Sequence, residues 1–195
     1  MSAVQATIIS VAAPPGGGKT TISRMISARL HDAPVLHYDD HEAWTGRDAA
    51  AIEAWLDRGA PLDEIAIPGF AAKLAAMRTG GAPQIIVDSP LGRAHPDIAA
   101  AIDFLIFIDT PFDIALARVV RHQAGLAARA PQTGAARDFA IWLEGYLDNY
   151  ARFMRRSYEV QRAKVMPQAD LVLDGTLAPD RLTELAMRAL AQEMP

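Results

Sequence analysis

The 195-residue sequence contains no cysteine. This absence excludes disulfide stapling, thiolate catalysis and Cys-ligated metal sites. The chain has no long block of like charges and a formal net charge of −4, so we expect neither nucleic acid nor an anionic membrane as a partner. Its longest apolar runs, such as FLIFI, are too short to cross a bilayer. Residues 1–13 lack the basic segment of a secretory signal, so we expect a cytoplasmic location.

Hydrophobic residues make up 51% of the chain, which suits one compact domain over residues 1–195. Short apolar runs alternate with Ala-rich amphipathic stretches. The runs are mostly continuous rather than alternating, which is typical of strands that are buried on both faces of a parallel sheet. The sequence therefore predicts an α/β fold: a three-layer sandwich with a five-stranded parallel sheet, helices on both faces and a helical lid. We expect the strands at residues 7–12, 34–38, 84–88, 104–109 and 170–174.

The amphipathic stretches between these runs predict the helices. We expect helix starts to be marked by capping residues, and one start is marked clearly. Thr110, Pro111 and Asp113 occupy the N-cap, first-turn and N3 positions of a capping-box variant. The expected helices span residues 19–31, 48–58, 69–79, 111–128, 137–164 and 179–192.

The stretch APPGGGKTT, residues 13–21, directly follows the first expected strand and opens the first expected helix. A strand, a glycine-rich turn, Lys-Thr and a helix form the context of a phosphate-binding P-loop, because the backbone N–H groups all point at one anion. The first position of the motif is Ala13 rather than Gly, which fits if its φ stays negative. The alternative is a glycine-rich turn with an exposed lysine. The predicted nucleotide-binding residues are Pro15, Gly16, Gly17, Gly18, Lys19, Thr20 and Thr21, with N–H donors from residues 16–21.

Three further landmarks follow the P-loop in order: HYDDH, IIVDSPLGR and FLIFIDTPFDIALARVVRH. The guanine motif N-K-x-D, a D-x-x-G switch and the L-S-G-G-Q signature are all missing. With these four landmarks the chain resembles the uridine kinase and nucleoside kinase group of P-loop kinases, and nicotinamide riboside kinase is similar in pattern. The resemblance implies an ATP- and Mg²⁺-dependent phosphotransferase that acts on a hydroxyl of a small molecule, which could be a nucleoside. A P-loop nucleotide-binding or assembly protein without acceptor chemistry is the alternative.

The resemblance also implies roles for individual residues. Asp39 matches the acid that orients the acceptor hydroxyl, and Lys19 is its catalytic partner on the phosphates. Asp88 and Thr20 match the Mg²⁺ site, although the family usually has Glu-Gly where this chain has Asp88-Ser89. The blander alternatives are a solvated loop for Asp39 and helix capping for Asp88.

A lid at about residues 122–137, mobile when empty, is implied to close over ATP. Arg118 and Arg121, three residues apart on one helical face, and Arg129 match its cations, although Val119 replaces an expected arginine. An ordinary solvated helix face is the alternative. The family's ribose-binding acid has no counterpart in Ala66-Ile67-Pro68-Gly69, so we expect weak activity on uridine. Homo-oligomer formation stays open. The predicted substrate-binding residues are Tyr38, Asp40, Arg93 and Tyr146, with Trp44 as a further aromatic group.

Overall fold

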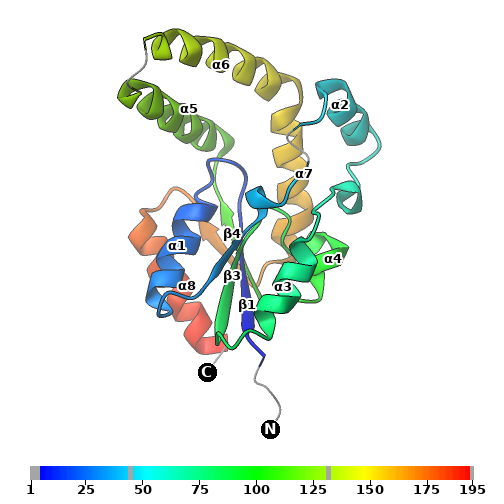
Figure 1. Cartoon of the computed structure of the whole chain (residues 1–195), viewed down its shortest axis with the longest axis vertical. Helices are drawn as coiled ribbons and strands as arrows, with labels where there is room; N and C mark the ends of the chain where they lie inside the picture. Colours follow the sequence, from blue (N-terminus) through cyan, green and yellow to red (C-terminus); the bar gives the residue numbers. More distant parts are fainter. Residues whose placement is uncertain (1–4, 44–45, 131–132, 194–195) are drawn as a thin grey trace.

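The computed structural model describes residues 5–43, 46–130 and 133–193. Five parallel strands form one sheet in the order β2-β3-β1-β4-β5. Helices cover both faces of this sheet (Figure 1), which confirms the predicted fold class. The strands are β1 Thr7–Ala12, β2 Val35–His37, β3 Gln84–Asp88, β4 Phe104–Asp109 and β5 Leu171–Asp174.

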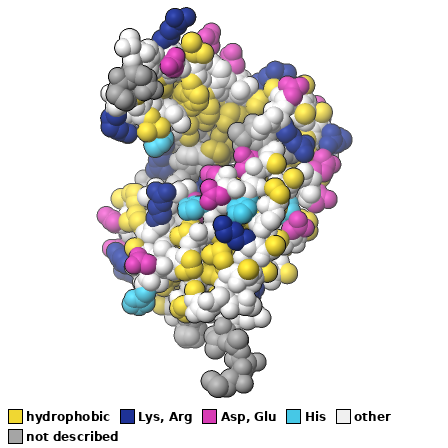
Figure 2. Space-filling view, viewed as in Figure 1, with side chains coloured by type: hydrophobic (Ala, Val, Ile, Leu, Met, Phe, Trp, Pro, Cys, Tyr) yellow, Lys and Arg dark blue, Asp and Glu magenta, His cyan; other side chains and the backbone are white. Residues whose placement is uncertain are grey.

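Most helices pack on the sheet, whereas α5 and α6 project beyond its end (Figure 1). They form an arch with α7, which leads back to the sheet and contributes Val165 to the core, and α2 lies beside this arch. Figure 2 shows hydrophobic side chains along the side of the arch that is turned toward the sheet. Within the described residues, no helix is both long and apolar enough to span a membrane. The helices are α1 Lys19–Arg29, α2 Ala49–Asp57, α3 Phe70–Arg78, α4 Pro96–Ala99, α5 Phe112–Arg129, α6 Ala135–Asn149, α7 Arg155–Val165 and α8 Pro179–Glu193.

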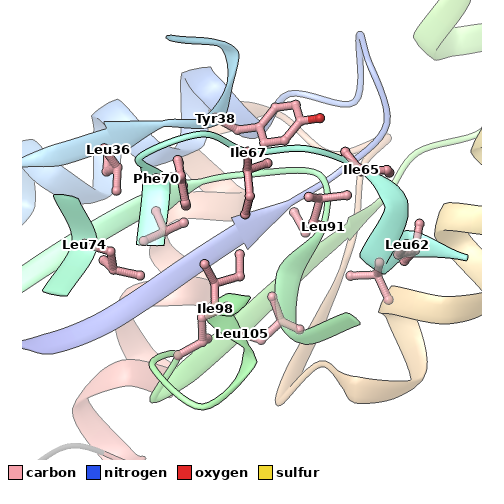
Figure 3. Close-up of a cluster of buried hydrophobic side chains, with 14 of the residues drawn as sticks. Leu36, Tyr38, Leu62, Ile65, Ile67, Phe70, Leu74, Leu91, Ile98 and Leu105 are labelled. Atoms are coloured by element: carbon pink, nitrogen blue, oxygen red, sulfur yellow. The ribbon is translucent and has the colours of Figure 1, made fainter. Parts of the chain in front are cut away.

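The core consists of two apolar layers, one on each face of the sheet. Neighbouring residues of β1 show why: Ile8 packs in one layer and Ile9 in the other, and both are fully buried. The layer of Ile9 includes side chains from α1 and α8. The layer of Ile8 includes Phe70 and Leu74 from α3 and Ile98 from α4 (Figure 3). Burial on both faces explains why the strand sequences are continuously apolar.

Most of the predicted lid segment, residues 122–137, is helical, as expected. Residues 122–129 continue α5, and α6 begins at Ala135, slightly before the predicted start at 137. The Ala-rich sequence favours helix on both sides. Residues 131–132 are outside the described residues. The single helix predicted at 137–164 is divided between α6 and α7 by one π-helical segment, Tyr150–Met154.

The predicted capping box is wrong. The N-cap of α5 is Pro111, and no side chain caps the helix there. The hydroxyl of Thr110 instead donates a hydrogen bond to the carbonyl of Gly17, over a distance of 3.0 Å. A tertiary partner has therefore taken the hydroxyl that the local pattern assigned to the helix.

Candidate active site

The P-loop connects β1 to α1 at the carboxyl edge of the sheet. Gly16 and Gly18 have φ values of +76° and +102°, which L side chains rarely adopt. A Cβ added to Gly16 would overlap the backbone carbonyl of Ala115 in α5. The φ of Ala13 is not positive, which is the condition under which alanine can replace glycine at the first position of the motif. The consecutive glycines thus serve backbone conformation and close packing together.

The backbone amides of the loop are divided between two uses. The N–H of Gly17 donates to the Pro14 carbonyl at 2.8 Å, so the prediction that it points at phosphate is wrong for this conformation. The carbonyl of Gly18 accepts the first α1 bond, from Ile22 at 3.0 Å. The N–H groups of residues 19–21 come before that bond, so they have no acceptor within the helix. They lie in the first turn of α1, where the helix dipole is positive and no acidic residue offsets it. An anion is the natural partner for this turn.

A charged group of four side chains lies beside the loop. The Lys19 ammonium is 3.6 Å from an Asp39 carboxylate oxygen and 3.7 Å from Asp88 Oδ1. His37 Nδ1 is 3.0 Å from the other oxygen of Asp88. These residues meet because β2 and β3 are parallel neighbours in which His37 is paired with Asp88. The structure therefore brings together three predicted residues, Lys19, Asp39 and Asp88, and adds His37.

Asp88 and Asp39 differ in burial. The side chain of Asp88 is 2% exposed, whereas that of Asp39 is 72% exposed. Asp88 Oδ1 is buried and has no hydrogen-bond partner among the described residues, although the Lys19 charge is close. A buried carboxylate oxygen in this state is costly unless a cation or a donor reaches it. The buried acid fits a metal-side role and the exposed acid fits contact with an incoming molecule.

The residues present fit a Mg²⁺ ion. This ion prefers oxygen ligands, keeps several waters, and is commonly held by one or two protein groups together with substrate phosphates. Asp88 Oδ1 and the hydroxyl of Thr20, which is in the first turn of α1, are oxygen ligands of that kind. No cluster of three or more His, Asp or Glu ligands occurs within the described residues, so an all-protein metal cage is not the arrangement here.

A cavity of about 280 Å³ opens next to Lys19 and Asp39. Its wall combines the P-loop, the segment after β2, α2, the segment after β3, and α7. Burial, followed by the negative charges of Glu42 and Asp39, raises the pKa of the Tyr38 phenol, which stays protonated at neutral pH. The apolar lining residues are Pro15, Tyr38, Trp55, Leu62, Ile65, Pro90, Leu91, Tyr158 and Val160.

The three predicted lid arginines lie along α5. Arg118 donates to the carbonyl of Gly175, in the segment after β5, at 2.9 Å. Arg121, three residues further on, is exposed. Arg129 is at the last turn of α5, about 16 Å along the helix axis from Arg118 at a rise of ~1.5 Å per residue. The structure therefore brings Arg118 near the P-loop end of α5 and leaves Arg129 at the outer end of the arch.

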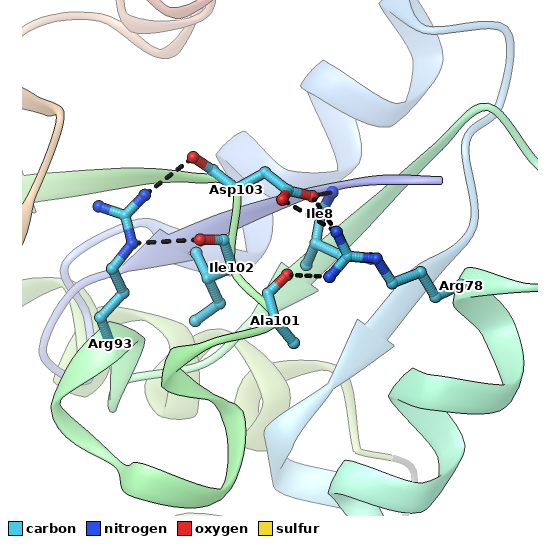
Figure 4. A network of polar contacts seen from close by, with 6 residues as sticks. All are labelled: Ile8, Arg78, Arg93, Ala101, Ile102 and Asp103. Atoms are coloured by element: carbon cyan, nitrogen blue, oxygen red, sulfur yellow. Dashed lines mark hydrogen bonds and ion pairs between the residues drawn. The ribbon is translucent and has the colours of Figure 1, made fainter. Parts of the chain in front are cut away.

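Arg93, predicted to contact substrate, is not at this edge. Its guanidinium donates to the carbonyls of Ile102 and Asp103 at 3.2 and 2.9 Å (Figure 4). It also donates to the carbonyl of Gln168 at 3.0 Å and is 2.7 Å from Asp170. These groups precede β4 and β5, so they lie at the amino edge of the parallel sheet. All three guanidinium nitrogens of Arg93 bond to groups at this edge, so we give Arg93 no role at the site.

Three other predicted substrate contacts have different places. Tyr38 lines the cavity. Asp40 is exposed, directly after Asp39, and does not line the cavity. Tyr146 is in α6, stacked on Trp142 with ring centroids 4.9 Å apart. Trp44 is outside the described residues.

The sequence reasoning missed the apolar part of the cavity. Trp55 and Leu62 are near each other in the chain and Tyr158 is far from both, and each has the pattern of an ordinary core residue. His37 had a usable signal, because it is the penultimate residue of the expected strand 34–38 and Asp88 ends the expected strand 84–88, and parallel strands end at the same edge. The Trp55 indole also donates to the Pro61 carbonyl at 3.0 Å, which fixes its ring.

Comparisons with known proteins agree with the fold. No protein-family model matches the chain. A uridine kinase-like protein 5 from Arabidopsis thaliana is 22% identical over 96% of this chain, which spans 44% of the length of that relative. The sequence resemblance to P-loop kinases of the uridine kinase-like type is thus supported.

Two solved structures cover nearly the whole chain. A gluconokinase from Sinorhizobium meliloti 1021 superimposes with a TM-score of 0.53 at 14% identity, over 97% of this chain and 93% of its own. A sugar kinase from Janibacter sp. HTCC2649 gives a TM-score of 0.52 at 21% identity, over 95% of both chains. At these identities the likeness shows the fold alone.

Proposed function

We propose that this protein is an ATP-dependent kinase that transfers the γ-phosphate to a hydroxyl of a small molecule. The observation that carries the proposal is the position of the Lys19 ammonium, between Asp39 and Asp88 and at the border between the P-loop and the cavity. Phosphoryl transfer needs a phosphate cradle, a metal ligand and a carboxylate that orients the acceptor hydroxyl. All three are supplied here within one group of side chains. The match to a uridine kinase-like protein supports the same reaction class.

The chain's own residues divide the work. The first-turn amides of α1 and the Lys19 ammonium hold the triphosphate, and Arg118 and Arg121 supply positive charge from the arch. Asp88 and the Thr20 hydroxyl would hold Mg²⁺, whose charge offsets that of the phosphates when it is bound. Asp39, exposed at the cavity, accepts the proton of the acceptor hydroxyl and aligns its oxygen with the γ-phosphorus.

Asp39→Asn tests the assignment of the base. The amide keeps the size of the side chain but accepts a proton poorly, so kcat for phosphotransfer should fall by about 10² or more. ATP affinity should barely change, because Asp39 is largely exposed and its ion pair with Lys19 is weak. Coupled detection of ADP release, over a panel of nucleosides, sugars and ring alcohols, measures kcat, and calorimetry measures the affinity.

Asp97→Asn is the matched control, since it removes an exposed aspartate from the first turn of α4. It should leave both quantities within about twofold of the unmodified protein. An unchanged kcat in Asp39→Asn would remove Asp39 from the mechanism. Tight Mg-ATP binding without transfer to any hydroxyl acceptor would favour a nucleotide-binding protein without acceptor chemistry.

A further inference from the structure

The cavity beside Asp39 has a composition that restricts its occupant. Apolar and aromatic side chains from six separate segments form most of its wall, including Tyr38, Trp55, Leu91 and Tyr158. Trp55 and Tyr158 are 3% and 5% exposed, so their rings are set firmly in the wall. A wall of this kind favours a flat or apolar body over a polyhydroxylated chain, which would lose hydrogen bonds to water on entry.

The charges that line the cavity also select against anions. Its described lining contains no arginine, and its one cation is Lys19. Lys19 already faces Asp39 and Asp88, and in the proposed kinase it is also the ligand of the phosphates. A carboxylate or phosphate on the acceptor would enter beside Asp39 without a cation of its own, and burying such a charge is expensive.

Arginines that surround the cavity are held elsewhere. Arg152 forms two 2.7 Å hydrogen bonds with Glu53, and Arg156 forms one of 2.8 Å with Asp57. The hydrogen bond from Arg152 lowers the pKa of Glu53, so this pair stays ionised through the neutral range. These pairs join the α2 side of the cavity to the helix that forms its opposite wall. They brace the cavity from outside rather than supplying it with positive charge.

The wall is also fixed in shape on the α7 side. The Gln161 amide donates to the Pro90 carbonyl at 2.8 Å, and the Lys164 ammonium donates to the carbonyls of Gly59 and Ala60 at 2.7 and 2.6 Å. At about 280 Å³ the cavity is at the lower end of the range for ligand pockets, roughly 300–1,000 Å³. Its size suits a compound with one ring and short substituents.

We infer that the acceptor is a small neutral or cationic alcohol with a single apolar or aromatic ring, and that acceptors bearing a carboxylate or phosphate are rejected. The inference rests on the proposed kinase function. The ring lies against Tyr38, Trp55 and Tyr158, and the hydroxyl points toward Asp39. The oxygen of that hydroxyl forms the new bond to the γ-phosphorus, the bond from this phosphorus to the β–γ bridging oxygen breaks, ADP leaves, and Asp39 takes the proton.

Matched acceptors test this inference on the 195-residue chain. The neutral probe is para-bis(hydroxymethyl)benzene, the cationic probe is para-aminomethylbenzyl alcohol, and the anionic probe is para-hydroxymethylbenzoate. All three have one ring and a benzylic hydroxyl, of which the neutral probe carries two, so its kcat/KM is compared per hydroxyl. The neutral and cationic probes should be phosphorylated with a kcat/KM at least about tenfold above that of the benzoate. Gluconate should be a poor acceptor for the same reason.

A charge placed in the wall should reverse the preference. Ser157 lines the cavity on α7, is half-buried, and bonds only locally, to the Phe153 carbonyl at 3.1 Å, among the described residues. Ser157→Arg should raise kcat/KM for the benzoate relative to the neutral probe by about tenfold or more, because the carboxylate gains a cation. Ser157→Gln, which adds bulk without charge, should not shift this ratio.

The outcomes separate the inference from the proposed function. Equal or better use of the benzoate by the unmodified protein would overturn the inference and leave the kinase function standing. Failure of all three probes both to bind and to react, in a protein that binds a non-hydrolysable ATP analogue with Mg²⁺, would also overturn the inference. Absence of ATP-analogue binding would instead count against the proposed function itself. An unshifted ratio in Ser157→Arg, with thermal unfolding unchanged, would show that the wall does not contact the acceptor.

Discussion

Charged side chains gather at both edges of the sheet, but they are satisfied in different ways. At the amino edge, Arg78 donates to the carboxylate of Asp103 and to the Ala101 carbonyl, and Asp103 also accepts the Ile8 N–H at 2.8 Å (Figure 4). At the carboxyl edge, the Lys19 ammonium stays 3.6–3.7 Å from two carboxylates, which is beyond an ordinary hydrogen bond.

This difference distinguishes structural charges, which are hydrogen-bonded within the protein, from functional charges, which are left for a ligand. The amino edge is largely closed, because the guanidinium of Arg93 and the two terminal nitrogens of Arg78 are matched by carbonyls and carboxylates of the protein. The buried Nε of Arg78 is the exception among these nitrogens, since it has no hydrogen-bond partner among the described residues. The carboxyl edge is open. The buried Asp88 Oδ1 lacks a hydrogen bond among the described residues, and the backbone N–H groups in the first turn of α1 have no partner within the helix. Mutations at the closed edge should therefore change stability, and mutations at the open edge should change ligand binding.

The largest stability effect is expected for Arg93→Ala. The substitution removes three bonds to carbonyls and an ion pair with Asp170, and the side chain of Arg93 is 22% exposed. The free energy of unfolding should fall by about 2 to 4 kcal/mol. Urea denaturation measures this loss, and calorimetry at a temperature where the variant is folded should give an unchanged affinity for the ATP analogue. A large loss of affinity with intact stability would place Arg93 in the site after all.

Lys19→Ala should have the converse effect. It removes a charge-assisted contact to phosphate of about 1.5 to 3 kcal/mol, which lowers ATP affinity roughly ten- to a hundredfold. Stability should change little, since its two carboxylate contacts are long. Lys73→Ala, at an exposed position of α3, is the control and should alter neither quantity. Equal ATP affinity in Lys19→Ala and the unmodified protein would contradict the assignment of the P-loop.

The smallest effect is expected for Asp170→Asn, and it depends on pH. Burial alone would raise the pKa of Asp170, but hydrogen bonds from Arg93 and the Leu105 N–H outweigh it and hold the pKa below its ordinary value of 3.8. A lowered folded-state pKa contributes stability above that ordinary value, and the contribution disappears as pH falls through the folded pKa. The variant should lose about 1 kcal/mol at pH 7, discounted for partial exposure.

Denaturation curves at several pH values check this dependence. The difference in unfolding free energy between Asp170→Asn and the unmodified protein should begin to narrow below about pH 3.8 and should disappear as pH falls through the lower folded-state pKa, where the Asp170 carboxylate becomes protonated. A difference that stays constant down to acid pH would show that the charge of Asp170 contributes nothing. Such a result would weaken the description of the amino edge as electrostatically closed.

The sequence by itself determined the fold class, the five strands and the P-loop. These depend on local signals: continuous apolar runs, and glycines at positions where φ is positive or the backbone of α5 comes close. It also placed Lys19, Asp39 and Asp88 at one edge, because residues that end parallel strands or follow them must meet there. These predictions needed no knowledge of how helices pack.

Only the tertiary structure decided the rest. The role of Arg93 depended on which carbonyls surround it, and that of Thr110 on the approach of Gly17, more than ninety residues away in the chain. The cavity wall combines Trp55, Leu91 and Tyr158, whose sequence patterns do not differ from those of core residues. Long-range packing sets such groupings, since apolar burial is non-directional and carries no information about partners. A short motif specifies a phosphate because its donors are consecutive, whereas an acceptor cavity is assembled from side chains that meet only after folding.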